Sequence, residues 1–232
     1  MKLDLLKAMN AARAARAACA LVTRLDDGSQ RFVAAERVAD DPLAEELEAA
    51  LRAGKSGTVE REGVSYFLTV QVPPVRLVMI GAVHISQALA PIARIAGLDP
   101  VVIDPRTAFA TPERFPETPV IAEWPDEALE TRPLDRYTAI CLLTHDPKID
   151  DRALTRALKA ECFYIGALGS RKTHAKRLER MKAEGFDDAA LARIHAPIGL
   201  DIGAVSPAEI AVSVAGEIVA SLRKKPLRSE RA

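Results

Sequence analysis

The sequence has few of the residues from which metal centres and disulfide frameworks are built. Its 232 residues include only three cysteines and four histidines, and no Cys-x-x-Cys or His-x-x-x-His spacing occurs. We therefore expect no zinc or iron–sulfur site. The odd number of cysteines, their wide separation and the apolar runs around two of them favour reduced core residues in a cytoplasmic protein. These cysteines are Cys19, Cys141 and Cys162.

An excess of charge of one sign is also absent. Lys and Arg together number 32, as do Asp and Glu, so the formal net charge is zero. No global field favours nucleic acid, an anionic membrane or a cationic substrate, and any charge selectivity must be local. No stretch approaches the roughly 20 apolar residues of a membrane span. The Arg-rich and Ala-rich N-terminal segment contains Asp4 and lacks a continuous apolar core, which argues against a signal peptide.

What the sequence does contain is enough apolar material for one large core and a smaller companion domain, since 49% of its residues are hydrophobic. Pro73 and Pro74 break the chain, and we predict a domain boundary there. The first domain, residues 1–73, is predicted to be a small α+β unit, and the second domain covers residues 74–232. The predicted elements of the first domain are helices 3–18 and 41–54 and strands 19–25, 30–36, 58–63 and 66–72.

Strands alternate with helices from residue 75 onward. This alternation predicts a parallel sheet covered by helices on both faces, which is a doubly wound, Rossmann-like α/β fold. The last helix is predicted to begin with a capping box, in which Ser206 is the N-cap and Glu209 follows three residues later. The predicted strands are 75–80, 100–105, 119–123, 138–146 and 162–168, and the helices before the last one end near residues 96, 160 and 185.

The loop after the first of these strands carries half of a dinucleotide-binding fingerprint. Gly81 occupies the tight-turn position, but Val83 stands where the second glycine of G-x-G-x-x-G would let backbone meet a pyrophosphate. Asp104 is placed like the acid that holds a ribose hydroxyl of NAD. Two interpretations follow. The loop either binds an NAD(P) cofactor, with His145 as a proton donor, or is only a tight strand-to-helix turn.

Two further loops carry polar groups at predicted strand ends, where ligands bind in doubly wound sheets. His145 and Asp146 could transfer protons or bind a polar cofactor edge, or could satisfy backbone groups before the helix near Asp150. In the next loop, Ser170 is the expected N-cap, and Arg171 and Lys172 fall in the first helical turn. The helix dipole disfavours cations there by about 0.3–1 kcal/mol each, so we favour a phosphate site over a solvated basic turn.

The last loop region, residues 194–209, is too apolar and glycine-rich for a simple connector. It either covers a ligand or packs beneath the last helix. It also contains one of the four histidines, which are distributed one to each loop region. We interpret these histidines as hydrogen-bond donors to a polyanionic or heteroaromatic ligand rather than as metal ligands. They are His84, His145, His174 and His195.

Four long segments of the second domain resemble one family. They are similar to the second domain of the xanthine dehydrogenase accessory (XdhC/CoxI) family over about residues 75–220. The resemblance implies a Rossmann-like domain that binds the molybdenum cofactor, protects it, supports sulfuration by a cysteine desulfurase and delivers it to a molybdenum hydroxylase. It also implies a homodimer. The segments include "RLVMIGAVHISQALAPIARIAGLDPVVIDP", "LTHDPKIDD", "CFYIGALGSRKTHAKRL" and "RIHAPIGLDIGAVSPAEIAVSVAGEI".

The resemblance also gives the loops a shared ligand. The segment from Gly169 to Lys172 would suit the terminal phosphate of molybdopterin, and the histidines would suit the oxo ligands or the pterin edge. The chain departs from the family at Val83, where Gly-Ala-Gly-His is typical, and in residues 1–73, where the usual N-terminal motifs are not recognisable. An NAD(P)-dependent oxidoreductase and a scaffold without ligand binding remain the alternatives. The candidate cofactor-binding residues are Gly81, His84, Asp104, Arg106, His145, Asp146, Gly166, Gly169, Ser170, Arg171, Lys172, His174, His195, Gly199 and Asp201.

Overall fold

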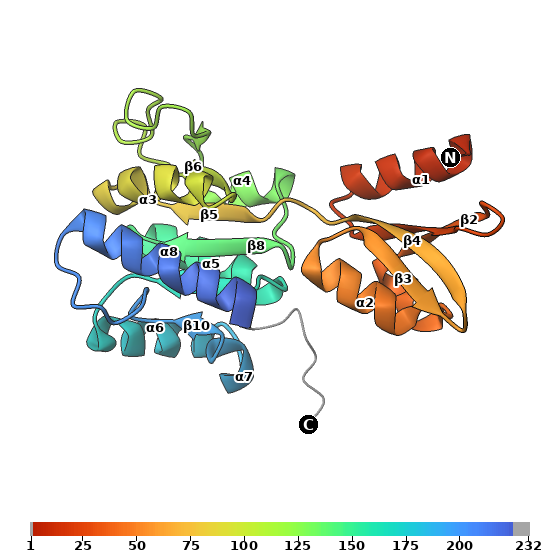
Figure 1. The fold of residues 1–232 in the computed structure, drawn as a ribbon. Helices are drawn as coiled ribbons and strands as arrows, with labels where there is room; N and C mark the ends of the chain where they lie inside the picture. The colour runs from red at the N-terminus through yellow and green to blue at the C-terminus, as the bar shows by residue number, and fades with distance from the viewer. Residues whose placement is uncertain (1, 225–232) are drawn as a thin grey trace. The chain divides into compact units, whose positions relative to one another are not determined.

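The computed structural model describes residues 2–224, which form two compact units that meet in sequence at Pro73 and Pro74 (Figure 1). The first unit contains a four-stranded antiparallel sheet in the order β2-β1-β4-β3. Its core contains Val22, Leu47 and Leu68, all fully buried. The elements of this unit are α1 (Leu3–Ala14), β1 (Cys19–Arg24), β2 (Gln30–Ala34), the 3₁₀ helix η1 (Ala35–Asp40), α2 (Ala44–Ala53), β3 (Gly57–Arg61) and β4 (Val64–Gln71).

The second unit contains a six-stranded sheet in the order β10-β9-β8-β5-β6-β7, in which every neighbouring pair is parallel. This sheet confirms the prediction of a doubly wound, Rossmann-like fold. The two central strands, β5 and β8, are apolar and almost entirely buried, as expected for strands covered on both faces. The strands are β5 (Arg76–Ile80), β6 (Asp99–Ile103), β7 (Val120–Ile121), β8 (Thr138–Leu142), β9 (Tyr164–Ala167) and β10 (Ile194–His195).

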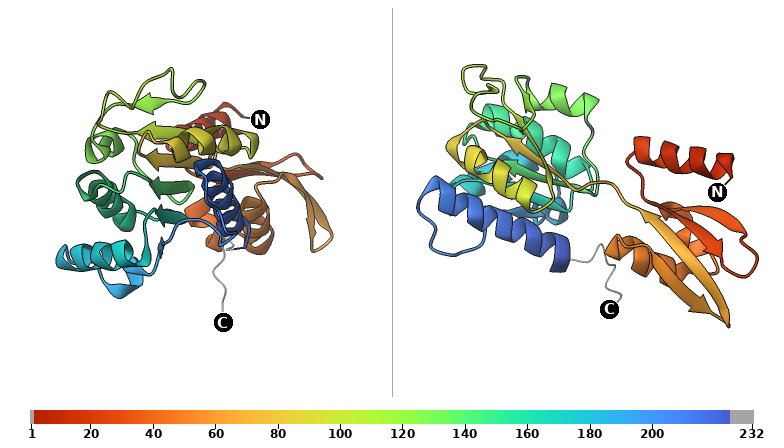
Figure 2. Two further views of the ribbon diagram at one scale, coloured as in Figure 1. Left: turned by 90° about the vertical axis from the view of Figure 1, so that its left-hand side faces the viewer. Right: turned by 45° about the horizontal axis from the view of Figure 1, so that its top comes forward.

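Helices cover both faces of this sheet (Figures 1 and 2). Leu77 and Met79 of β5 pack in one core with α3 and α8, whereas Val78 and Ile80 pack in a second core with α4, α5 and α6. Successive side chains of a strand point to opposite faces, so one short strand supplies both cores. The helices are α3 (His84–Ile95), α4 (Pro125–Thr131), α5 (Pro147–Lys159), α6 (Arg171–Ala183), α7 (Asp188–Leu191) and α8 (Pro207–Lys224).

Several element boundaries differ from those predicted. The predicted helix 3–18 ends at Ala14, and Arg16 adopts a positive φ of 51°. The predicted strand 138–146 ends at Leu142, and the helix expected near Asp150 already begins at Pro147. Proline suits the first turn of a helix because it has no N–H to leave unpaired. The short elements η1, α4, α7 and β10 were not predicted, because segments of this length give only weak periodic signals.

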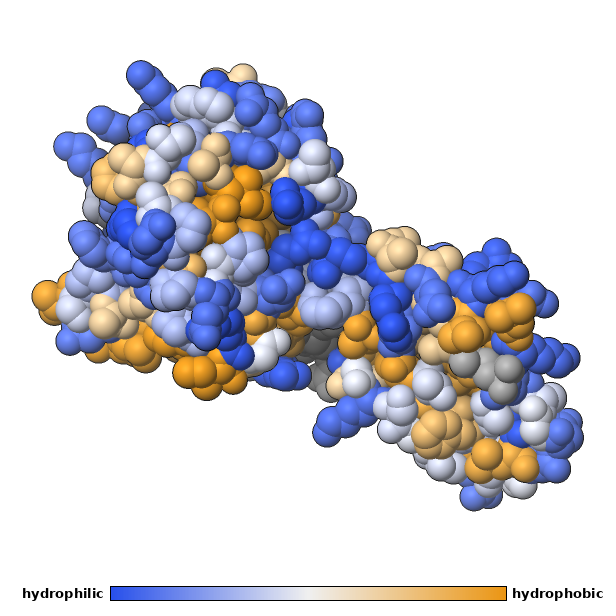
Figure 3. Space-filling model, turned by 90° about the horizontal axis from the view of Figure 1, so that it is seen from above, coloured by the Kyte–Doolittle hydropathy of each residue, from blue (hydrophilic) through white to orange (hydrophobic). Residues whose placement is uncertain are grey.

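The three cysteines are buried and not disulfide-bonded, as predicted for core residues. Burial raises the pKa of Cys162 to about 12, so its thiol is protonated at neutral pH and unreactive. Within residues 2–224, no helix combines the length and apolar character needed to cross a membrane. On the face seen from above, polar side chains surround separate apolar patches (Figure 3).

Candidate functional site

The topological switch point of the second unit lies between β5 and β8. From β5 the chain proceeds to β6 and β7 on one side and then returns to β8 on the other side. Gly81 follows β5 with a φ of +114°, and a Cβ atom there would lie 2.8 Å from the Thr144 side chain. Glycine is therefore required for the close approach of the loops after β5 and β8. Ligands of doubly wound sheets bind at this edge, outside the carboxyl ends of the strands.

The loop after β5 is held by hydrogen bonds from within the unit. The amide of Ala82 donates to Asp104 Oδ2 at 2.7 Å, and the amide of Val83 donates to Ser86 Oγ at 2.9 Å. Arg114 Nη1 donates to the Ala82 carbonyl at 2.9 Å. Two amides that could have faced a pyrophosphate thus already have partners. This arrangement favours the interpretation of a tight strand-to-helix turn over that of an NAD(P) loop.

Asp104 is fully buried and its carboxylate accepts four hydrogen bonds, one from the amide of Ala82 and three from Arg106. The side chain of Arg106 forms a bidentate pair with it, at 2.9 Å from Nε and 2.7 Å from Nη2. Desolvation raises the pKa of Asp104, but these hydrogen bonds outweigh it and the net pKa is lowered. The carboxylate therefore fixes the loop after β5, and its oxygens are occupied where the sequence suggested a ribose contact.

The two polar residues predicted in the loop after β8 have different roles: Asp146 caps a helix, and His145 is exposed. Asp146 is the N-cap of α5, and its carboxylate accepts the amide of Lys148 at 2.9 Å. The interpretation that it satisfies backbone groups thus holds for Asp146. His145 is exposed and adopts a positive φ of 61°. Thr144 donates through Oγ1 to Asp150 Oδ1 at 2.7 Å, which ties this loop to the first turns of α5.

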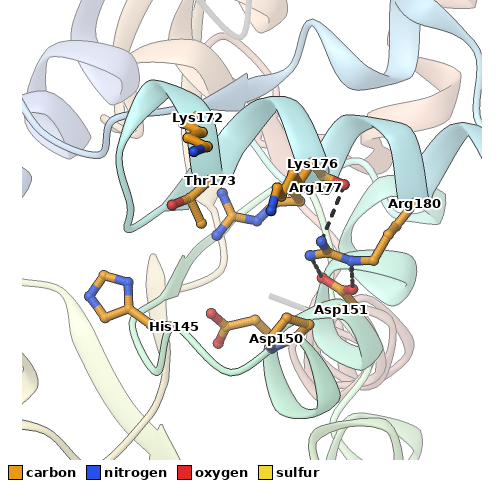
Figure 4. Close-up of a pocket in the computed structure, with 9 residues that line it drawn as sticks. His145, Asp150, Asp151, Lys172, Thr173, Lys176, Arg177 and Arg180 are labelled. Carbon is orange, nitrogen blue, oxygen red and sulfur yellow. Dashed lines mark hydrogen bonds and ion pairs between the residues drawn. The ribbon is translucent and has the colours of Figure 1, made fainter.

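A cavity of about 210 Å³ lies between α5 and α6, and His145 forms part of its lining (Figure 4). We call it the α5–α6 cavity. Its wall comes from the loop after β8 and from one side of each helix. The lining residues are His145, Pro147, Asp150, Asp151, Lys172, Thr173, Lys176, Arg177 and Arg180.

Two buried charged side chains of this cavity have unused hydrogen-bonding atoms. Arg177 is 2% exposed; its Nη2 donates to the Leu168 carbonyl at 2.9 Å, but Nε and Nη1 have no partner. Asp150 is also 2% exposed, and its Oδ2 has no partner. Both side chains point into the space between the helices in Figure 4. Burial raises the pKa of Asp150 to about 6 and lowers that of Arg177.

The α5–α6 cavity carries an excess of positive charge. Arg180 is neutralised by Asp151, at 2.5 Å from Nε to Oδ2 and 3.0 Å from Nη2 to Oδ1. Arg177, Lys172 and Lys176 then face the single carboxyl group of Asp150. In the described part of the chain, no acidic side chain forms an ion pair with either lysine. A buried guanidinium with nearby ammonium groups is suited to an oxyanion.

The N-terminus of α6 contributes only part of the phosphate loop that the sequence predicted. Ser170 is the N-cap, as predicted, and its Oγ accepts the amide of Thr173 at 3.2 Å. Gly169 has a φ of +133°, which favours glycine. Lys172 lines the α5–α6 cavity, but Arg171 is exposed and is not one of its lining residues.

The four histidines do not share one cavity. His174 lines a separate cavity of about 350 Å³ beside α7, and its buried Nδ1 has no partner. Burial lowers the pKa of His174. His84 is the exposed first residue of α3. Of the predicted histidine donors, only His145 lines the α5–α6 cavity.

The fourth histidine belongs to a partly buried hydrogen-bond network that the sequence did not reveal. His195 Nδ1 lies 3.0 Å from Glu217 Oε1, while the Tyr164 hydroxyl and the Gly199 amide donate to Oε2 at 2.6 and 2.8 Å. Desolvation raises the pKa of Glu217, but these partners reverse the shift and lower it. Because Glu217 lies on α8, the network fastens the last loop onto that helix.

The last loop therefore packs against α8, one of the two interpretations of its composition. Ile198 is buried in the core, and Ser213 Oγ donates to the Leu200 carbonyl at 2.5 Å. Gly166 is a packing position, since a Cβ there would lie 2.6 Å from Ile198 and from the Tyr164 hydroxyl. Asp201 is exposed on this loop.

Sequence reasoning missed Arg177, Lys176 and Asp150, which supply most of the charge in the α5–α6 cavity. Lys176 follows Lys172 by four residues, so the two lysines lie one turn apart on one face of α6. Arg177, the next residue, lies about 100° further round the helix and is buried. Asp150 follows the N-cap Asp146 by four residues in the same way. These spacings were the available signal. Across residues 2–224, no group of three or more His, Cys, Asp or Glu side chains is arranged to hold a metal ion.

Comparison with known proteins supports one family. A family model described as the XdhC Rossmann domain matches residues 77–218. The chain is 34% identical over 161 residues to the uncharacterized protein YqeB of Escherichia coli, covering 67% of this chain and 29% of that protein. It is 31% identical over 153 residues to a probable xanthine dehydrogenase subunit of Bacillus subtilis, covering 66% and 44%. It is 32% identical over 151 residues to the molybdenum cofactor insertion chaperone PaoD of Escherichia coli, covering 65% and 41%.

These matches span less than half the length of each of the three curated relatives. A solved structure described as a xanthine dehydrogenase from Bacillus halodurans aligns with 96% of this chain and 67% of its own, with a TM-score of 0.69 and 23% identity. At that identity the likeness concerns the fold, and it extends across both units.

Proposed function

Because the chain belongs to the XdhC family, as its sequence resemblance predicted, we propose that it is a molybdenum cofactor-binding chaperone. It would protect the cofactor and deliver it to a molybdenum hydroxylase of the xanthine dehydrogenase or carbon monoxide dehydrogenase type. The observation that carries the proposal is the unpaired positive charge of the α5–α6 cavity, which is lined in part by the loop after β8. The similarity to PaoD, a molybdenum cofactor insertion chaperone, supports the same role.

The chemistry of the cavity fits one end of the cofactor. Molybdopterin ends in a phosphate group, for which Arg177, Lys172 and Lys176 provide donors and charge. His145 would contact the pterin or the oxo ligands at the rim of the cavity. When bound, the cofactor supplies its own molybdenum and dithiolene, so the chain itself needs only to bind, orient and release it.

The proposal extends to partners and location. A molybdenum hydroxylase would be the client, a cysteine desulfurase would supply the sulfur for maturation, and the chain would act as a cytoplasmic homodimer. The names of the relatives in Bacillus subtilis and Escherichia coli support the molybdenum hydroxylase client. The desulfurase, the homodimer and the cytoplasmic location are proposed from the family resemblance. The chaperone role requires no catalytic residue in this chain.

Anaerobic purification from cells that make the cofactor tests the proposal. Oxidation of the purified protein should release the fluorescent pterin derivative of molybdopterin. The double variant Lys172→Ala and Lys176→Ala should carry several-fold less pterin, because it removes two cations of the cavity. Lys159→Ala, at the far end of α5, is the matched control and should carry the same amount as the native chain.

Pterin no higher than in an unrelated protein purified in parallel would contradict cofactor binding. In that case, calorimetric titration with NAD(H) and NADP(H) tests the oxidoreductase alternative. If the protein binds neither pterin nor nicotinamide nucleotide but still captures a hydroxylase, the scaffold alternative is supported.

A further inference from the structure

The unused atoms of Arg177 and Asp150 make opposite demands on a ligand. Arg177 Nε and Nη1 are donors, so they need an acceptor. Asp150 Oδ2 accepts hydrogen bonds when the carboxyl is ionised, so it needs a donor. A ligand that satisfies both must present an acceptor and a donor within one small cavity. Leaving either buried group unpaired is unfavourable, because its hydrogen bonds to water are lost and not replaced.

A phosphate group that retains one proton meets both demands. Its P–O⁻ oxygens accept from Arg177, and its P–OH donates to Asp150. Sulfate and carboxylate anions are fully deprotonated near neutral pH and offer acceptors only. Lys172 and Lys176 balance the remaining charge of a phosphate dianion. We propose that the α5–α6 cavity is a site for a protonated phosphate group, held by Arg177 and selected by Asp150.

This inference deepens the proposed function and rests on it only for the natural ligand. The terminal phosphate of molybdopterin is a phosphomonoester with a second pKa near 6, so it would take up a proton from solvent when it binds this site at neutral pH. The binding chemistry itself can be measured with simple anions. The groups that face Asp150 are Arg177, with Lys172, Lys176 and Arg180 on α6, Asp151 beside it on α5, and Thr144 and His145 in the loop after β8.

The pH dependence distinguishes this site from a plain cluster of cations. The pKa of Asp150 is about 6, so at pH 7.5 its carboxyl is mostly ionised and repels an anion that brings no proton. Below that pKa the carboxyl itself becomes a donor and accommodates sulfate as well. Selectivity for phosphate over sulfate should therefore be high at pH 7.5 and small at pH 5.5.

Isothermal titration calorimetry of the full chain with inorganic phosphate and with sulfate tests the inference. At pH 7.5, phosphate should bind at least about tenfold more tightly than sulfate, since a site with a buried acceptor rejects an analogue that lacks the donor. At pH 5.5 the two affinities should differ by less than about threefold. Equal affinities at pH 7.5, or no binding of phosphate at millimolar concentrations, would overturn the inference.

Variants separate the two side chains. Asp150→Asn replaces the acceptor with an amide that also donates, so sulfate and phosphate should bind equally well at pH 7.5. Arg177→Lys should weaken phosphate binding by about tenfold or more, because a single ammonium group replaces the free N–H groups of Nε and Nη1. Arg156→Lys is the matched control, since Arg156 lies on the exposed side of α5 in an ion pair with Glu130. If Arg177→Lys does not fold, the exposed Lys176→Ala should still weaken phosphate binding several-fold, and unchanged binding contradicts the assignment.

A phosphomonoester distinguishes the two sources of phosphate. Inorganic phosphate keeps one proton at pH 7.5, whereas ethyl phosphate loses its last proton near pH 6. Binding of the ester at pH 6 with an affinity that falls about tenfold by pH 7.5 supports a terminal phosphate as the ligand. Exclusion of the ester at both pH values supports free phosphate. Phosphate binding without pterin would contradict only the proposed function, and pterin without phosphate binding would contradict only this inference.

Discussion

At the scale of the residue, Asp104 stabilises the fold by fixing the loop after β5. We expect Asp104→Asn to lower the free energy of unfolding by about 2–3 kcal/mol at pH 7, because a buried carboxylate loses its charge-assisted bonds to Arg106 and Ala82. The folded-state pKa of Asp104 lies below the unfolded value of about 3.9, so its stabilisation is complete above that value and is lost as the pH falls through the folded pKa. Urea denaturation should show a constant difference between pH 5 and pH 8. A difference that changes within that range would contradict this account.

Glu217 is the residue whose role depends most on distant partners. Its carboxylate joins His195, Tyr164 and the amide of Gly199 into one network. A double-mutant cycle with Glu217→Gln and Tyr164→Phe should give a coupling free energy of about 0.5–3 kcal/mol, measured by urea denaturation. Additive effects would show that the hydroxyl and the carboxylate stabilise the fold independently.

At the scale of the element, helix geometry separates two adjacent cations of α6. Consecutive helical residues point about 100° apart, so Lys172 lines the α5–α6 cavity and Arg171 does not, although both side chains are exposed. Lys172→Ala should weaken phosphate binding several-fold, and Arg171→Ala should leave the dissociation constant within about twofold, as measured by calorimetry at low salt. An equal loss in both variants would show that the binding responds to the general charge of the helix N-terminus.

At the scale of the whole molecule, each unit has its own core. The two cores of the second unit draw on residues from Val75 to Leu222, and those of the first unit draw on residues from Leu5 to Val70. A fragment of residues 74–232 should therefore unfold in one cooperative urea transition and bind phosphate within about twofold of the full chain. A fragment without a cooperative transition would show that the second unit depends on the first.

The sequence predicted a large part of the fold because its signals are local. Alternating apolar strands and helices predict the parallel sheet, and short-range chemistry predicts the caps at Ser170 and Ser206. The capping box is present, with the Glu209 carboxylate accepting the Ser206 amide and Ser206 Oγ accepting the Glu209 amide. The loop after β5 could not be interpreted in the same way. Its amides are satisfied in part by Asp104, 22 residues further along the chain.

The sequence by itself determined the fold class and the family, and it predicted the loops at which a ligand would bind, because each depends on residue order within a short segment. The tertiary structure alone decided which side chains of those loops meet. It placed His174 and His145 in separate cavities and paired the Asp104 carboxylate with Arg106. It also brought Arg177 and Asp150 into one cavity, where each retains side-chain atoms without a hydrogen-bond partner. The physical reason is that hydrogen bonding and burial depend on distances between helices, and those distances are set by how α5 and α6 pack on the sheet.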